Sequence, residues 1–367
     1  MNNVMDVINA ERIEDVQAVM QEPGDARLRI RGGGSKTALS TPRAGERILD
    51  LSRLSGILEY EPGEYTFTAL AGTPIREVQA ALAEHGQYLP FDPPLAGAGA
   101  TLGGTVASGL SGSGRQRYGG VRDFLIGARF VDGQGRLVRG GGKVVKNAAG
   151  FDLPKLMVGS LGRLGALVEL SFKVFPRPAA YATVAAPFAS LDDAVDAMVR
   201  LSAAPLDVEA LDLTPDADGF TLWARLGGVA QVLDERAERL RSFLDGGDIL
   251  VGEEERAHWR TVGEFAWLSG DASLIKVALT PIQVAILESR LPAPADSPRR
   301  YSVAGNLAWL AWSTPISELD AILAGLNLPG LLILGDGQPA LLGRRPDARF
   351  LVRIKRVLDP AGRLLGF

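Results

Sequence analysis

A run of three glycines directly after a predicted strand is the first candidate for chemistry in this sequence. The strand covers residues 27–30, and the run reads Arg31-Gly32-Gly33-Gly34-Ser35-Lys36. Consecutive glycines can turn their N–H groups inward as a nest, which a diphosphate can occupy without meeting a Cβ atom. The Ser35 hydroxyl and the Lys36 ammonium would add a donor and a charge. Neither GxxxxGK[ST] nor GxGxxG is present, so two interpretations stay open for this hexapeptide, a diphosphate cradle and an ordinary flexible turn.

A longer glycine-rich segment lies further along the chain. It begins with Asp92-Pro93-Pro94, continues through Thr101-Leu102-Gly103-Gly104-Thr105, and reaches Tyr118-Gly119-Gly120-Val121-Arg122-Asp123. Of the 44 glycines in the chain, 15 lie between Gly97 and Gly142. Such a permissive backbone without a ligand would leave many N–H and C=O groups unpaired. We therefore predict that this segment lines a ligand that is extended, flat in part and anionic in part.

A third element combines polar residues with spaced glycines. The stretch from Lys146 to Leu153 reads KNAAGFDL, and Gly159, Gly162 and Gly165 follow it. Glycines at this spacing would let a loop lie flat against a ring system before the strand predicted at residues 166–174. Pro176 and Pro178 end that strand, and we place the first domain boundary at residue 178.

The elements that must position these motifs follow from apolar periodicity. Helices are predicted at residues 13–20 and 74–83, strands at 47–51 and 66–71, and a hairpin at 125–131 and 137–139. Beyond residue 180 the pattern changes to two βαββαβ passes joined by a helix at residues 254–268. This repeat predicts two ferredoxin-like halves that form one sheet with helices on one face. A short helix at residues 349–357 precedes the turn that contains Asp359 and Gly362.

Composition narrows the functional classes. The chain has 367 residues, 46% of them hydrophobic, and a formal net charge of -4. The absence of cysteine excludes disulfides, iron–sulfur ligation and thiol nucleophiles. Dispersed mild acidity argues against nucleic-acid binding. No segment has the composition of a signal peptide or a membrane span, so we expect a cytoplasmic protein, held at the inner face of the membrane only if a complex attaches it there.

The three glycine-rich elements, in this order and spacing, resemble the flavin-binding domain of the vanillyl-alcohol oxidase (PCMH-type) superfamily. The stretch from Thr101 to Pro178 is similar almost throughout to the smaller FAD-binding subunits of glycolate oxidases (glycolate dehydrogenases). The resemblance implies an α+β fold, in which a two-subdomain FAD-binding domain carries an inserted ferredoxin-like cap. We expect the FAD-binding domain at residues 1–178, the cap at 179–340, and a C-terminal segment at 341–367 that returns to the FAD-binding domain.

The resemblance also implies which residues contact FAD. Carried over by position, they are Arg31, Gly32, Gly33, Gly34, Ser35 and Lys36 at the pyrophosphate; Pro93, Thr101, Leu102, Gly103, Gly104, Ser108, Gly109 and Gly112 along the pyrophosphate and the flavin face; and Gly119, Asp123, Gly159 and Leu167 at the dinucleotide. Covalent members carry a histidine directly after paired glycines, where this sequence has Gly34. The resemblance therefore implies noncovalent FAD.

Members that oxidise 2-hydroxy acids by themselves use cap histidines around a motif like HxGDGNxH. Here Ile333 and Ala340 stand at the two histidine positions of the nearest match, which is either a degenerate remnant or an ordinary Asp-Gly turn. We therefore predict no catalytic base and no metal site in this chain. His85 is predicted to end a helix, and His258 to lie at the surface or in an interface.

By analogy with the family, the chain is expected to work in a glycolate-oxidising complex that forms glyoxylate. Its partners would be a larger flavoprotein subunit that performs the oxidation and an iron–sulfur subunit that passes electrons onward. Two alternatives stay open at this point. One is a stand-alone FAD-dependent oxidoreductase of a small hydroxy acid or alcohol, and the other is a cofactor-free assembly subunit.

Overall fold

A small parallel sheet forms the N-terminal part of the protein, in the order β1-β3-β2. A computed structural model describes residues 6–24, 26–142, 152–336, 339–345 and 347–366 of the chain. The elements of this part are β1 (Val7–Asn9), α1 (Ile13–Gln21), β2 (Arg27–Arg31), α2 (Thr37–Ser40) and β3 (Glu46–Asp50). The predicted helical spacing is confirmed, because α1 buries Val16, Val19 and Met20 against the sheet. The three glycines Gly32, Gly33 and Gly34, called the glycine loop from here on, directly follow β2. This sheet therefore fixes where the loop begins.

A second sheet is five-stranded and antiparallel, in the order β4-β5-β9-β7-β8. Its strands are β4 (Ile57–Glu61), β5 (Thr66–Leu70), β7 (Leu125–Val131), β8 (Leu137–Gly141) and β9 (Ala166–Lys173). The predicted hairpin is confirmed, with β8 two residues longer than expected. Around it lie η1 (Pro62–Glu64), α3 (Ile75–Ala83) and the two-stranded pair β6 (Gln87–Tyr88) and β10 (Phe175–Pro176).

The glycine-rich segment from Asp92 to Phe124 contains three short helices, which apolar periodicity did not predict. They are α4 (Leu102–Ser108), α5 (Arg115–Tyr118) and α6 (Val121–Phe124), and α7 (Leu153–Met157) follows later. α4 forms because the Thr101 side chain accepts a hydrogen bond from the N–H of Gly104 at 3.2 Å, which caps its first turn. Glycine content alone did not reveal this helix.

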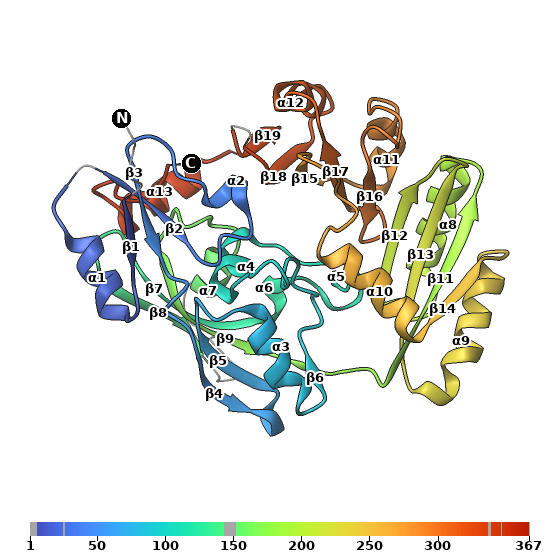
Figure 1. Ribbon diagram of the computed structural model, residues 1–367, viewed down its shortest axis with the longest axis horizontal. Coiled ribbons are helices and arrows are strands. Elements are labelled where there is room, and N and C mark those ends of the chain that lie inside the picture. Colours follow the sequence, from blue (N-terminus) through green and yellow to red (C-terminus); the bar gives the residue numbers. More distant parts are fainter. Residues whose placement is uncertain (1–5, 25, 143–151, 337–338, 346, 367) are drawn as a thin grey trace.

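The nine-stranded sheet after residue 179 has the order β14-β11-β13-β12-β16-β17-β15-β18-β19 (Figure 1). Two ferredoxin-like halves meet where Leu213 pairs with Tyr301, so the predicted repeat is confirmed. The first half consists of β11 (Ala180–Phe188), α8 (Leu191–Ala203), β12 (Ala210–Pro215), β13 (Phe220–Gly228), α9 (Ala230–Phe243) and β14 (Asp248–Val251). The second consists of β15 (Ser273–Ala278), α11 (Pro281–Glu288), β16 (Arg299–Ser302), β17 (Leu307–Trp312), α12 (Ile316–Gly325), β18 (Pro329–Leu334) and the edge strand β19 (Leu341–Gly343).

Helices cover both faces of this sheet unequally. Side chains from α8, α9, α11 and α12 share one buried cluster with the sheet, whereas α10 (Gly252–Gly263) packs on the opposite face, where Trp259 and Val262 meet Ala210. The helices of the two halves therefore lie on one face as predicted, whereas the joining helix α10 lies on the other and ends earlier than predicted. The rest of that face packs on the part of the chain that precedes β11, because Leu274 and Trp309 belong to the same buried cluster as Phe91 and Val106.

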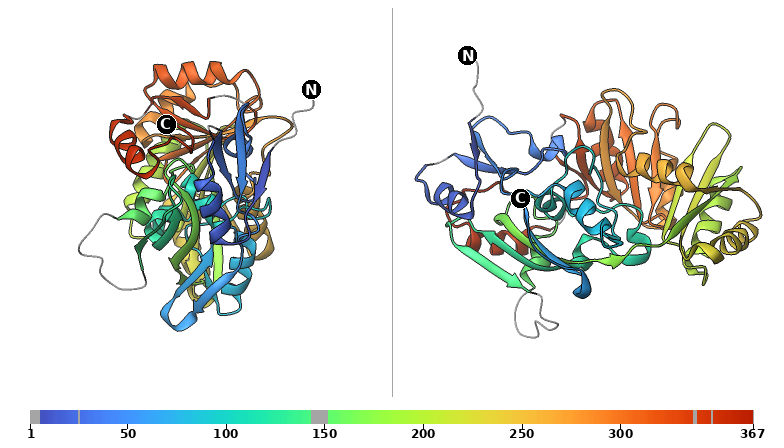
Figure 2. Two further views of the ribbon diagram at one scale, coloured as in Figure 1. Left: turned by 90° about the vertical axis from the view of Figure 1, so that its left-hand side faces the viewer. Right: turned by 60° about the horizontal axis from the view of Figure 1, so that its bottom comes forward.

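The C-terminal segment returns to the first sheet (Figure 2). After α13 (Arg349–Leu358), Leu364 forms a parallel bridge with Leu28 and is almost fully buried. The Lys355 ammonium donates to the carbonyl of Arg163 at 2.8 Å and forms an ion pair with Asp359 at 2.7 Å. These contacts hold the C-terminal segment against β2 and the loop that precedes β9. Within the described ranges, no helix combines the length and the apolar character that a bilayer crossing requires.

Candidate functional site

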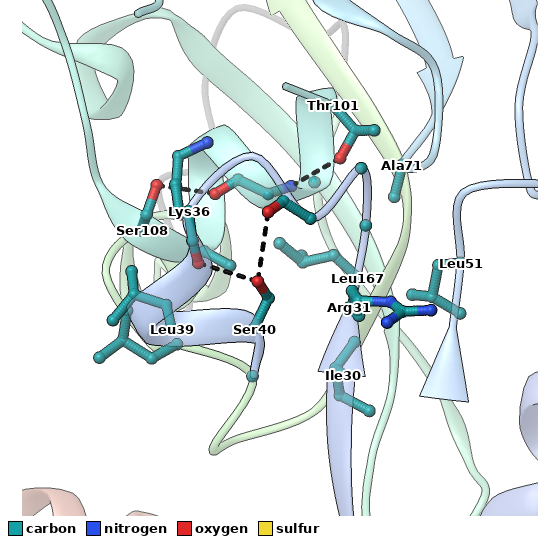
Figure 3. A pocket seen from close by; sticks show the side chains of 18 of the residues that line it. Ile30, Arg31, Lys36, Leu39, Ser40, Leu51, Ala71, Thr101, Ser108 and Leu167 are labelled. Carbon is teal, nitrogen blue, oxygen red and sulfur yellow. Dashed lines mark hydrogen bonds between the residues drawn. The ribbon is translucent and has the colours of Figure 1, made fainter. Parts of the chain in front are cut away.

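A cavity opens where the glycine loop, α2 and α4 converge (Figure 3). Its empty volume of about 730 Å³, part of it open to solvent, falls in the range of small-molecule sites. Most of its exposed lining is apolar. The residues that line it are Ile30, Arg31, Gly32, Gly33, Gly34, Ser35, Lys36, Leu39, Ser40, Leu51, Ala71, Thr101, Gly103, Gly104, Ala107, Ser108, Leu161, Gly162, Gly165 and Leu167.

The glycine loop is closely packed on one side and has free donors on its backbone. A Cβ atom at Gly32 would collide with the Thr101 hydroxyl, and one at Gly33 with the Gly99 carbonyl oxygen. No described residue accepts a hydrogen bond from the N–H groups of residues 32–35. Gly34 has a φ of +69°, the left-handed region that favours glycine. The loop therefore keeps a conformation that only glycines permit and offers unpaired N–H donors to a ligand.

Lys36 adds a buried positive charge to the same wall (Figure 3). The residue is 6% exposed, and its ammonium has one hydrogen-bond partner among the described residues, the Ser35 hydroxyl at 3.2 Å. Burial lowers the pKa of Lys36 to about 8. A buried ammonium without a carboxylate destabilises the fold unless an anion binds beside it. The chemistry of this donor set, an ammonium and several N–H groups, fits a diphosphate.

Arg31 fixes the start of the loop and does not supply a second free cation. Its guanidinium forms an ion pair with Asp50 at 2.6 Å, at the end of the neighbouring strand β3. Asp50 also accepts from the N–H of Ser52 at 2.8 Å. The side chain of Arg31 is therefore held by the sheet beneath the loop.

In the second glycine-rich segment, the backbone N–H groups of residues 102–104 already have acceptors within the protein. The N–H of Leu102 donates to the carbonyl of Thr73 at 3.0 Å, and that of Gly103 to Ala71 at 2.7 Å. The N–H of Gly104 is taken by Thr101. These three N–H groups are therefore not available to a ligand, although Gly103 and Gly104 line the cavity. Gly103 is glycine for another reason, since its Cβ would lie 2.8 Å from that of Ala71.

Eleven of the eighteen predicted site residues line the cavity, and the other seven lie elsewhere. Pro93 and Gly112 line a separate cleft beside the cap, together with Arg300 and Trp309. The remaining five, which line neither, are Leu102, Gly109, Gly119, Asp123 and Gly159.

Two of these residues have an evident structural function. Asp123 accepts from the N–H of Gly120 at 2.8 Å and so begins α6, while its side chain stays exposed. A Cβ at Gly119 would collide with that same carboxylate. Their contact with a dinucleotide stays a prediction.

Sequence reasoning missed part of the cavity wall. Leu39 and Ser40 come from the short helix α2, and Leu51 and Ala71 stand just after strand ends. Nothing in these common residue types signals a site. For Leu51 and Ala71, the position directly after β3 and β5 was the available signal.

Buried carboxylates of the cap form hydrogen bonds to the part of the chain that precedes β11. Asp212 accepts from the Ser113 hydroxyl at 2.7 Å and from Arg300 at 3.1 Å. Glu209 accepts from the Tyr118 hydroxyl at 2.8 Å, and burial raises its pKa. The bonds from Ser113 and Tyr118 join one structural part to the other, so the position of the cap depends on them.

The two histidines lie away from the cavity lining. His258 stacks on Trp223, with ring centroids 4.0 Å apart, and its Nε2 has no hydrogen-bond partner in the described chain. Burial, and then the charges of Arg300 and Arg225, lower its pKa to about 4. His258, in α10, is half-buried against β13, and its predicted place at the surface or in an interface stays a prediction. The described residues hold no group of three or more His, Cys, Asp or Glu side chains that could bind a metal ion.

Parts of two predicted motifs lie outside the described residues. They are residues 146–151 of the third glycine-rich element and residues 337–338 of the Asp-Gly motif.

Comparisons with known proteins agree with this geometry. A family profile described as "FAD binding domain" matches residues 6–141. The chain is 35% identical over 345 residues to the glycolate oxidase subunit GlcE of Escherichia coli (strain K12), covering 91% of this chain and 90% of that protein. It is 30% identical over 212 residues to the glycolate oxidase subunit GlcD of Bacillus subtilis (strain 168), covering 56% and 45%. It is 33% identical over 169 residues to a D-2-hydroxyglutarate dehydrogenase of Xanthomonas citri pv. viticola, covering 45% and 36%.

The fold is also found in solved structures. An alkyldihydroxyacetonephosphate synthase superposes with a TM-score of 0.71 at 15% identity, covering 98% of this chain and 76% of that one. The α+β fold class of PCMH-type flavoproteins is thereby confirmed, and FAD is the cofactor that the matched domain binds. The match over residues 6–141 includes the glycine loop, Lys36 and α4.

Proposed function

The chain belongs to the family of glycolate oxidase subunit GlcE, and we propose that it is the FAD-binding subunit of a complex that oxidises glycolate to glyoxylate. The structural observation that carries this proposal is a buried lysine, Lys36, which has no carboxylate partner among the described residues. It lies beside the N–H groups of residues 32–35, which have no acceptor there either. An identity of 35% over nine-tenths of both chains supports the substrate class.

In this proposal, different residues of the cavity contact different parts of the cofactor. Gly33, Gly34, Ser35 and Lys36 would hold the diphosphate through backbone N–H groups, a hydroxyl and an ammonium. The apolar wall formed by Leu39, Leu51, Leu161 and Leu167 would exclude water from the rest of the dinucleotide. When bound, FAD supplies a two-electron acceptor. The link is noncovalent in this proposal, because Gly34 stands where covalent members have histidine.

The expected partners are a larger flavoprotein subunit and an iron–sulfur subunit. The separate names of the relatives, subunit GlcE and subunit GlcD, support an assembly of more than one kind of subunit. Neither histidine of this chain lines the cavity, so no imidazole stands ready there to take a proton from a hydroxy acid. We infer that the larger subunit supplies the base and that this chain binds FAD for electron transfer or for assembly.

Reconstitution from purified subunits tests the proposal. The chain alone, loaded with FAD, is expected to show no glycolate-dependent dye reduction, whereas co-expression with the larger flavoprotein and iron–sulfur subunits restores it. FAD release from the denatured chain, measured by absorbance, establishes loading independently of activity. Turnover by the isolated chain at the rate of the complex would contradict the division of work, and a failure to bind FAD would contradict the proposal itself.

The variant Gly33→Ala provides a matched test within the complex. Its Cβ would collide with the Gly99 carbonyl, whereas that of Gly325→Ala, in α12, meets nothing within 4 Å. We expect the first variant to lose FAD and the second to retain it.

A further inference from the structure

A second cleft lies between the cap and the part of the chain that precedes β11. Its empty volume of about 1140 Å³, part of it open to solvent, exceeds that of the candidate cofactor cavity. No described residue lines both spaces. Pro93 and Gly112, which the resemblance assigned to the flavin face, lie on the wall of this cleft. The cleft is therefore a separate space, large enough for a small molecule, and the proposed function supplies no occupant for it.

Aromatic rings form much of the wall of this cleft. The centroid of the Phe265 ring lies 4.7 Å from that of Trp309 and 6.1 Å from that of Trp267. Trp259, in α10, lines the same space. Phe265 holds a left-handed backbone, with a φ of +54°, which costs free energy in a residue with a bulky side chain. Most of the exposed lining is apolar, so a flat apolar ring is the group that this wall contacts best.

Two side chains of the wall carry hydrogen-bond donors that lack acceptors. Arg300 is 7% exposed, and only its Nη1 has an acceptor among the described residues, a carboxylate oxygen of Asp212 at 3.1 Å. The indole N–H of Trp267 is buried and has no partner in the described chain. Buried donors without acceptors are unfavourable, so an occupant with an acceptor oxygen would be stabilised in this cleft.

The largely buried guanidinium groups of the wall are already neutralised. Arg225 forms an ion pair with Glu255 at 2.7 Å, and Arg300 forms one with Asp212 at 3.1 Å. The other charged residues of the lining, two arginines that are exposed to solvent and two carboxylates, are Arg76, Arg260, Asp92 and Glu264. An anionic ligand would place a further negative charge beside carboxylates that are already paired. The charge balance therefore favours an uncharged occupant.

We propose that this cleft binds an uncharged, planar ring compound that carries a carbonyl oxygen. The ring would lie against Phe265 and Trp309, and the carbonyl oxygen would accept a hydrogen bond from the guanidinium of Arg300. Asp212 holds that guanidinium in place, and is itself held by the Ser113 hydroxyl, which donates to it at 2.7 Å. The inference does not depend on FAD, because the cleft is separate from the cofactor cavity.

Equilibrium dialysis of the full-length chain against coumarin, which is flat and uncharged and has a ring carbonyl, tests the proposal. We expect saturable binding at one site, with the same affinity in the apoprotein and in the chain loaded with FAD. Naphthalene, which lacks the carbonyl, and coumarin-3-carboxylate, which is anionic, should each bind about tenfold more weakly. Displacement of coumarin by FAD would show that the cleft belongs to the cofactor and would overturn the proposal. Equal or tighter binding of either analogue would overturn it as well.

An arginine pair on β16 provides a matched test of the donor. Arg300→Lys keeps a charge beside Asp212 but removes the planar fork of N–H groups, so it should weaken coumarin binding about tenfold. Arg299 is similarly buried, forms an ion pair with Glu288 and is not among the residues that line the cleft. Arg299→Lys should therefore leave the affinity unchanged. Equal losses in the two variants would show a general effect on the cap and would overturn the proposal.

Gly263→Leu tests the space itself without changing a charge. Gly263 ends α10 on the cleft wall, and a Cβ atom added there meets nothing within 4 Å. The new side chain should occupy part of the cleft and weaken coumarin at least as strongly as Arg300→Lys does, whereas Gly325→Leu in α12 should have no effect. This result supports the proposal even if Arg300→Lys does not fold, and unchanged binding in Gly263→Leu overturns it. A chain that binds coumarin but no FAD would contradict the proposed function and not this inference.

Discussion

The glycine loop at residues 32–34 and the glycine pair at residues 103–104 resemble each other in sequence but serve different purposes. In the loop, the N–H groups have no acceptor in the described chain, and Lys36 beside them lacks a counter-ion. In the pair, every N–H is already bonded, to Ala71 or to Thr101. In the loop, the glycines leave room and N–H donors for a ligand. In the pair at residues 103–104, glycine lets a helix approach a strand.

The same substitution at both places should separate the two uses, and the larger effect is expected in the loop. Gly33→Ala places a Cβ against the Gly99 carbonyl, so the loop must shift. We expect the affinity for FAD to fall by at least about thirtyfold, or about 2 kcal/mol. Quenching of flavin fluorescence in a titration measures it. Unchanged affinity would show that the loop does not hold the cofactor.

Gly103→Ala should act on stability first. Its Cβ would lie 2.8 Å from that of Ala71 and 2.9 Å from the Ala71 carbonyl oxygen. We expect the free energy of unfolding of the apoprotein to fall by about 1–2 kcal/mol, measured by denaturant titration. Gly325→Ala is the control and should be neutral or slightly stabilising, since it meets no neighbour. If Gly103→Ala weakened FAD binding with no loss of stability, the comparison would be wrong.

Lys36→Met should reduce the affinity for FAD by about tenfold at pH 7. The pKa of Lys36 in the apoprotein, about 8, gives the direction in which the affinity for FAD changes with pH. Below pH 8 the ammonium is charged and attracts the diphosphate, and above pH 8 it loses its proton and the attraction. Wild-type affinity should therefore decline above pH 8, and Lys36→Met should lack that component. Parallel pH profiles for both proteins would exclude this role for Lys36.

The stability of the apoprotein should show the opposite trend. The folded pKa of Lys36 lies below its ordinary value of 10.5, so the unfolded chain binds more protons between these two values. The contribution of Lys36 therefore becomes more favourable as the pH rises from 8 to 10.5. The difference in the free energy of unfolding between wild type and Lys36→Met, measured at each pH, gives the contribution of Lys36.

Thr101→Ala should have the smallest effect of the series. It removes the cap of α4, which is worth about 1 kcal/mol of stability. Thr101→Ser keeps the hydroxyl and should restore most of that loss in thermal unfolding. A Thr101→Ala variant as stable as wild type would show that α4 is held by its packing and not by its cap.

Much of the fold could be predicted from periodicity. The hairpin of β7 and β8, the repeat in the cap and the C-terminal helix follow from local patterns of apolar residues and turns. The helix α4 could not be predicted in this way, because its first turn depends on a cap and on contacts with Ala71 and Thr73, which are distant in sequence. The site was predicted best where contact residues are consecutive, as in residues 31–36, and worst where single residues from separate strands converge.

The sequence by itself determined three things. It placed the start of the predicted diphosphate loop, it excluded thiol chemistry in this chain, and it indicated that two similar halves build the cap. Only the tertiary structure decided which glycines leave their N–H groups unbonded and which lysines lose their hydration. The physical reason is that hydrogen-bond satisfaction and burial depend on neighbours that the chain brings together from distant positions. Lys36 is an ordinary lysine in the sequence, and packing alone leaves it without a counter-ion among the described residues.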